Sequence, residues 1–206
     1  AVDDGLIDKT PFTRKTKPPK VVQKTPNALD QEDYDKAIEL LQGGRHTVVE
    51  TAALITLFTG MRREEVAALR WCDVDLERRV ILVTNAVGIA EGGSYIKGTK
   101  RDKPPRPVPI RDGLVEVLKT REGQQRAEIK RLNKKLSDDG KLTIESAFKF
   151  TNKLYVCGGV DGGYANPDTL SRKLKPLADS VLPIGNQGEP LSFLSLRHSF
   201  ATELVR

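Results

Sequence analysis

Hydrophobic residues recur along this chain in a pattern that predicts a mainly helical domain. Residues 47–59 are apolar on almost every side, which is typical of a helix that is buried on all faces. Asp30 can cap an earlier helix, because acidic residues follow it in the first turn and Gly43 ends the pattern. Gly60 follows the buried helix, and we expect a second, short helix over residues 63–69.

The second half of the chain mixes strand and helix signals. The β-branched run at residues 79–84 predicts a strand, and residues 94–110 predict two short strands around a basic turn. Residues 147–151 predict one more short strand. Helical patterns occupy residues 112–136, 166–182 and the stretch from 195 onward. We therefore expect an α+β fold that is mostly helical and has a small antiparallel sheet.

Length and charge allow one domain that binds an acidic partner. The chain has 206 residues, of which 38% are hydrophobic, and this is enough for one sizeable core. Its formal net charge is +6, which permits binding to phosphate-rich molecules but does not require it. Residues 1–25 are rich in Lys, Thr and Pro and predict a basic linker, either a solvated tail or a strap along DNA phosphates. The folded domain is expected over residues 26–206.

Cysteine and histidine are too scarce for a metal-based or disulfide-based protein. Cys72 and Cys157 lie far apart, which excludes a disulfide scaffold and a cysteine-based zinc site. With only His46 and His198 besides, we expect no metal. There is no signal-peptide pattern and no apolar run near the ~20 residues that span a bilayer, so we expect a cytoplasmic protein without membrane contact. Both ends read as cut, since the chain lacks an initial Met and stops within a helical pattern.

The first of three basic clusters is TGMRREEVAALRWCDVD, at residues 59–75. Arg62 stands between two predicted helices, where apolar packing would hold it, and its planar guanidinium suits two phosphate oxygens. Glu65 lies three residues further on the same helix face and can orient an arginine. Taken alone, such a spacing is more commonly an ordinary surface Arg–Glu pair.

The second cluster is the basic turn, which holds Lys97, Lys100, Arg101, Lys103 and Arg106. A lysine on a hairpin tip can reach into a groove, and its ammonium can protonate a leaving oxygen. The alternative interpretation is a solvated loop.

The third cluster is LSFLSLRHSFATEL, at residues 191–204, with Arg197 and His198 adjacent. Arg197 would lie in the first turn of a helix, whose free N–H groups also attract anions. The alternative is a core helix with two polar residues on its rim.

In their order and surroundings, the three clusters resemble the tyrosine recombinase family, also called phage integrases. Members carry a TG[LM]RxxE[LV] box after a buried helix, then a lysine in a sheet, then HxxRH[ST]FA, then a distant tyrosine. Residues 59–66 match the first box, residues 197–202 match the last, and the resemblance covers roughly residues 25–206. It implies a DNA breaking-rejoining catalytic domain at 26–206, with residues 1–25 as the end of a core-binding domain helix and an interdomain linker.

The resemblance also implies a mechanism for the full-length protein, which would be bacterial or phage-encoded and nucleoid-associated. Site-specific DNA recombination or integration would proceed through a 3′-phosphotyrosine, without a cofactor, on double-stranded DNA held by a recombinase tetramer. Arg62 and Arg197 would clamp the phosphate, Glu65 would align them, and Lys100 (or alternatively Lys97) would protonate the departing 5′-oxygen. The expected DNA contacts are Lys97, Arg101, Lys103 and Arg106.

Two departures from the family pattern bear on activity. The histidine of HxxR would fall on Leu194, which cannot hydrogen-bond a phosphate, and His198 is the nearest substitute. The nucleophile is also missing, because all four tyrosines precede Arg197: Tyr34, Tyr95, Tyr155 and Tyr164. We therefore expect this chain alone not to cleave DNA. A recombinase-like protein that binds DNA without cutting it is the alternative; a type IB topoisomerase-like enzyme and a purely structural helical domain are further ones.

Overall fold

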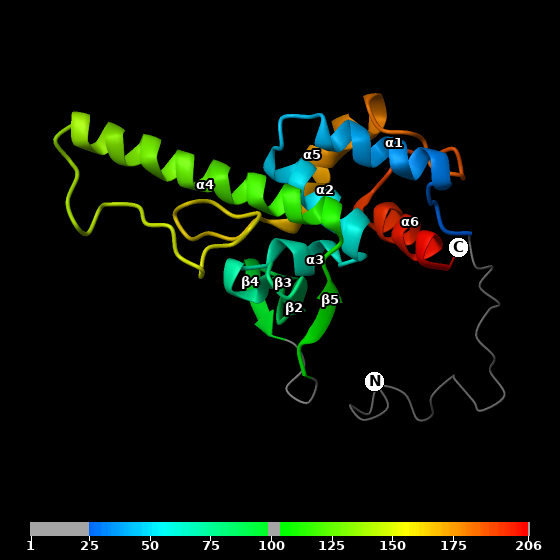
Figure 1. Ribbon diagram of the computed structural model, residues 1–206, viewed down its shortest axis with the longest axis horizontal. Coiled ribbons are helices and arrows are strands. Elements are labelled where there is room, and N and C mark those ends of the chain that lie inside the picture. The colour runs from blue at the N-terminus through cyan, green and yellow to red at the C-terminus, as the bar shows by residue number, and fades with distance from the viewer. Residues whose placement is uncertain (1–24, 99–103, 206) are drawn as a thin grey trace, which may run out of the picture.

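Figure 1 shows a computed structural model of the chain, in which residues 25–98 and 104–205 are described. The helices are α1 (Gln31–Gln42), α2 (Val48–Thr59), α3 (Arg63–Ala67), α4 (Asp112–Asp138), α5 (Pro167–Ser180) and α6 (Phe193–Val205), with a 3₁₀ turn η1 (Trp71–Asp73). The strands are β1 (Val74–Asp75), β2 (Val80–Val83), β3 (Asn85–Ala90), β4 (Gly93–Gly98) and β5 (Arg106–Pro109). The expected α+β fold, mostly helical with a little antiparallel sheet, is confirmed. The linker expected over residues 1–25 lies almost entirely outside the described residues.

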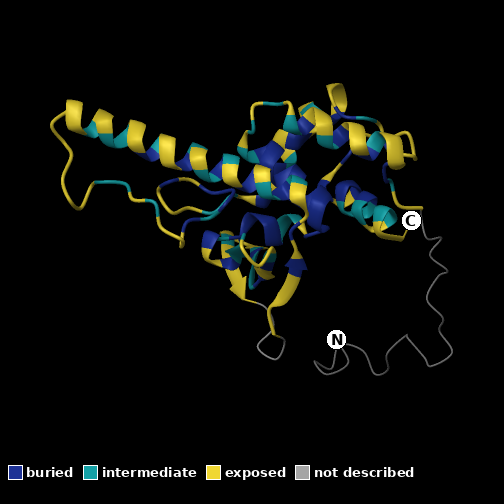
Figure 2. Ribbon diagram, in the orientation of Figure 1, coloured by how far each residue is buried: buried dark blue, intermediate teal, exposed yellow. Residues whose placement is uncertain are grey.

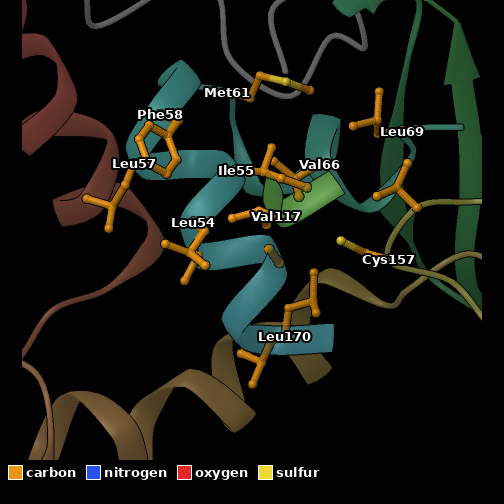
Figure 3. Packing of buried hydrophobic residues seen from close by; sticks show 14 of the residues in the cluster. Leu54, Ile55, Leu57, Phe58, Met61, Val66, Leu69, Val117, Cys157 and Leu170 are labelled. Carbon is orange, nitrogen blue, oxygen red and sulfur yellow. The ribbon is translucent and has the colours of Figure 1, made fainter. Parts of the chain in front are cut away.

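Helix α2 forms the centre of the core and packs against α1, α3, α4, α5 and α6. Every residue from Val49 to Thr59 is buried, as the all-apolar pattern predicts, and Figure 3 shows Leu54, Ile55 and Leu57 within this packing. A capping box starts the helix: Glu50 N–H donates to the Thr47 hydroxyl, and Thr47 N–H donates to the Glu50 carboxylate.

The strands form two small antiparallel sheets, β1–β2–β5 and β3–β4. Val83 is opposite Arg106 and Asn85 is opposite Gly98, so the pairing partner changes from β5 to β4 on either side of Thr84. The expected strands on either side of the basic turn are confirmed as β4 and β5. Among the described residues, β4 pairs with β3 and β5 pairs with β2. The centre of the basic turn, expected as a hairpin tip, lies outside the described residues. The tip of the β3–β4 hairpin lies at residues 91–92, where Gly92 has a φ of 102°.

Helix α4 has an inner half that belongs to the core and an outer half that extends away from it (Figures 1 and 2). Leu114, Val117 and Leu118 are buried on the inner half. Arg121 differs from the exposed cations farther along α4. Its side chain is buried and donates hydrogen bonds to the carbonyls of Val156 (2.9 Å) and Gly158 (3.0 Å).

The strand expected at residues 147–151 is absent from the described part of the chain. This segment runs back beside α4, and its polar groups bond to a side chain instead of a neighbouring strand. The Phe148 N–H donates to the Asn133 side chain, whose amide donates to the Phe148 carbonyl, both at 2.9 Å. Among the described helices, none combines the length and the apolar character that crossing a membrane requires.

Candidate functional site

The site begins where α2 ends. Gly60 has a φ of 60°, a left-handed conformation that lets the chain turn into α3 within two residues. Arg62 precedes α3, its N–H donates to Glu65 Oε2 at 2.9 Å, and its Nη1 donates to Glu65 Oε1 at 3.1 Å. The Arg62 side chain is 62% exposed, whereas that of Glu65 is 11% exposed. A nearly buried carboxylate thus holds an accessible guanidinium.

A second arginine reaches the same carboxylate from the sheet. Arg106, the first residue of β5, donates from Nη2 to Glu65 Oε2 at 2.9 Å. From the sequence we expected Arg106 only as a DNA contact, and the sequence did not indicate its hydrogen bond to Glu65. The two residues are far apart in the sequence, so no local pattern could have indicated the contact.

Arg197 joins this group from α6. Its Nη1 donates to the carbonyl of Gly60. The pKa of Arg197 is lowered, first by burial and then by the nearby positive charges of Arg62 and Arg106, while Glu65 opposes the shift. Arg62, Arg106 and Arg197, which we call the arginine cluster, are therefore close enough to influence one another around one carboxylate. We expected Arg62, Glu65 and Arg197 to come together, and they do.

A pocket of about 350 Å³ opens beside two members of the arginine cluster. Its lining consists of Arg62, Arg63, Glu64, Ser171, Ser192, Phe193, Leu194 and Arg197. Leu194, the residue at the position of the motif histidine, is 61% exposed and lies in this lining. Arg63, Ser171 and Ser192 were not singled out from the sequence, since α3, α5 and the segment before α6 meet only in the folded chain.

The remaining candidate residues are not all at this pocket. His198 lines a different pocket, together with Pro26, Asn186 and Thr202. Lys97 is exposed on β4, opposite Ala86. Lys100, Arg101 and Lys103 lie outside the described residues.

The site is rich in arginine and poor in metal ligands. Within residues 25–98 and 104–205, no three His, Cys, Asp or Glu side chains gather closely enough to hold a metal ion. Two guanidiniums that are fixed beside an open pocket can instead bind an anion with several oxygens, through charge-assisted hydrogen bonds. The geometry thus suits an oxyanion as the ligand.

Known proteins that resemble this chain point the same way. The Tyrosine recombinase XerC-like protein of Caldanaerobacter subterraneus subsp. tengcongensis is 26% identical over 219 residues, covering 99% of this chain and 51% of that protein. Tyrosine recombinase XerA of Thermococcus onnurineus is 26% identical over 192 residues, covering 93% of this chain and 53% of that protein. The chain therefore spans about half the length of these curated relatives.

Solved structures resemble the chain in fold. The Tn1549 transposon integrase in complex with transposon right end DNA matches with a TM-score of 0.60 and 20% identity, over 100% of this chain and 61% of that one. A crystal structure of XerA recombinase matches with a TM-score of 0.54 and 18% identity, over 89% of this chain and 52% of that one. Residues 27–206 match the phage integrase family. The chain belongs to the phage integrase family, whose members include the tyrosine recombinases.

Proposed function

We propose that this chain supplies the phosphate-binding arginine cluster of a site-specific DNA recombinase or integrase. The observation that carries the proposal is the arrangement of Arg62 and Arg197 beside one open pocket, with Glu65 behind them. Family membership and the fold shared with an integrase that was solved with DNA support double-stranded DNA as the substrate. A recombinase tetramer on paired DNA sites is the proposed assembly of the whole protein.

In the proposed reaction, a tyrosine hydroxyl attacks a DNA phosphodiester and forms a 3′-phosphotyrosine, and the 5′-oxygen departs. The pentacoordinate transition state concentrates negative charge on the non-bridging oxygens. Arg62 and Arg197 are held before the phosphate arrives, so they stabilise this charge with little further loss of conformational entropy. Lys100, or alternatively Lys97, is the proposed acid for the 5′-oxygen.

DNA binding by the 206-residue chain tests this proposal. We expect the chain to bind a fluorescent duplex with an affinity that falls as salt rises, because phosphate contacts release counterions. Arg62→Ala and Arg197→Ala should each weaken binding by about tenfold or more, the value of one charge-assisted hydrogen bond. Fluorescence anisotropy measures both effects. Absence of binding, or binding that neither substitution changes, would contradict the proposal.

Leu194 favours a second candidate function, which is DNA binding without cleavage. An exposed leucine in the pocket lining cannot donate a hydrogen bond to a phosphate oxygen or accept the tyrosine proton. The chain's own tyrosines, Tyr34, Tyr95, Tyr155 and Tyr164, are not among the residues that line this pocket. A nicked suicide substrate should therefore give no protein–DNA adduct that survives SDS. Such an adduct would rule out the second candidate.

A further inference from the structure

We infer that Arg106 is a positioning residue, which orients Arg62 toward the phosphate by way of Glu65. This inference rests on the proposed function, since it concerns how the same phosphate is held. It goes beyond the DNA-contact role that the basic turn suggested for Arg106.

The two carboxylate oxygens of Glu65 accept hydrogen bonds from different partners. Oε2 accepts from the Arg62 backbone N–H and from Arg106 Nη2, both at 2.9 Å, while Oε1 accepts from Arg62 Nη1 at 3.1 Å. The two bonds to Oε2 fix the rotation of the carboxylate. Oε1 is then held toward the Arg62 guanidinium.

The backbone of Arg106 is held by strand pairing. It is opposite Val83 in the β2–β5 pairing, so its backbone belongs to the sheet. Its bond to Glu65 therefore ties the sheet to the start of α3, where Arg62 is located. If this tie is removed, the exposed Arg62 guanidinium keeps only the contacts that its own helix turn provides.

The position of Arg106 also argues for an indirect role. It does not line the pocket that Arg62 and Arg197 share. Its charge nevertheless contributes to lowering the Arg197 pKa, so it lies near the site. A cation this close to two other arginines costs free energy through repulsion, and the Glu65 carboxylate offsets that repulsion.

The contact with Glu65 requires one positively charged hydrogen-bond donor at position 106. Arg106 reaches Glu65 through one nitrogen, Nη2, whereas a two-pronged arginine contact would use two. One ammonium can replace a single donor of this kind, so lysine should serve at this position. Glutamine lacks the charge and should not.

A double-mutant cycle between Arg62 and Arg106 tests the inference. DNA affinity is measured by fluorescence anisotropy for the unaltered chain, Arg106→Gln, Arg62→Ala and the double variant. If Arg106 acts through Arg62, Arg106→Gln should weaken binding on the order of tenfold in the unaltered chain and less than about twofold once Arg62 is gone. Arg106→Lys should recover most of the affinity. In a second cycle, Glu65→Gln replaces Arg62→Ala. On that background too, Arg106→Gln should weaken binding by less than about twofold.

The control is another arginine that pairs with a carboxylate near the same sheet. Arg79 pairs with Asp112, and Arg79→Gln removes the same charge as Arg106→Gln but should change affinity by less than about twofold. Thermal midpoints of all variants identify any loss of folding.

The outcomes of the cycle separate the role of Arg106 from the proposed function. Equal losses from Arg106→Gln with and without Arg62 would overturn the inference, because Arg106 would then contact DNA independently. No effect of Arg106→Gln, while Arg62→Ala abolishes binding, would overturn the inference and leave the proposed function intact. Failure of the unaltered chain to bind DNA would remove both.

Discussion

Two groups of basic residues in this molecule differ in what holds them. The arginine cluster converges from α3, β5 and α6 on the Glu65 carboxylate and the Gly60 carbonyl. The outer half of α4 carries as much positive charge, in an exposed group consisting of Lys130, Arg131, Lys134 and Lys135. Within the described residues, none of these four forms an ion pair.

The difference shows that the number of charges does not by itself make a site. Long side chains in water lose rotational freedom when they bind, which cancels much of their Coulomb gain. Arginines that are already fixed by hydrogen bonds avoid most of this loss. We therefore expect the arginine cluster to dominate the affinity for DNA and the outer half of α4 to contribute little.

The largest effect is expected from Gly60→Ala, which disturbs the turn beneath the arginine cluster. A Cβ at Gly60 would lie 2.3 Å from Phe200 Cδ1, and the residue has a φ of 60°. Backbone strain and overpacking should each cost about 1–3 kcal/mol. The thermal midpoint should fall and DNA affinity should fall with it, because the Gly60 carbonyl holds Arg197.

Gly140 provides the matched control, at the end of the outer half of α4. It has a φ of 66°, and a Cβ there would meet nothing within 4 Å. Gly140→Ala should cost the strain alone, so its midpoint should lie roughly 3–10 °C above that of Gly60→Ala in a chain of this size. Equal midpoints would show that the turn at Gly60 is not tightly packed.

A smaller effect is expected from Leu194→His, which adds a donor to the arginine-lined pocket. DNA affinity should rise several-fold below the ordinary histidine pKa of about 6.5, where the ring is charged, and the gain should fade as pH rises above it. Leu204→His is the control, because Leu204 is similarly exposed on α6 but does not line the pocket. An equal gain from both substitutions would mean that charge alone matters.

The smallest effect on DNA is expected from Asn133→Ala, in the outer half of α4. This substitution removes two hydrogen bonds to Phe148, each worth about 1 kcal/mol. Amide exchange measured by mass spectrometry should accelerate in residues 141–150, while DNA affinity should stay the same. A marked loss of DNA affinity would show that the outer half of α4 is part of the DNA-binding surface.

Local parts of this structure could be predicted from the sequence, and contacts between distant segments could not. The buried α2, the Asp30 cap and the Arg62–Glu65 spacing each depend on residues within one or two helical turns. The proximity of Arg62 and Arg197 could be predicted only from the resemblance to a family, because the two residues are far apart in the sequence.

The failures have a common physical cause. Arg106 bonds to Glu65 only because β5 pairs with β2, and strand register cannot be derived from residue type. Arg121 carries a charge, as surface residues commonly do, yet its side chain is buried and donates hydrogen bonds to two backbone carbonyls of a distant segment. Residues 147–151 form no strand, because the Phe148 backbone bonds to the Asn133 side chain instead of to another strand.

The central claim is that fixed arginines, and not total charge, hold the DNA phosphate. It is tested most directly by two double variants, Arg62→Ala with Arg197→Ala and Lys130→Ala with Lys134→Ala. Each lowers the formal net charge of +6 by two. At equal salt, the first pair should lose about a hundredfold in affinity for duplex DNA and the second less than about threefold. Equal losses from the two pairs would contradict the claim.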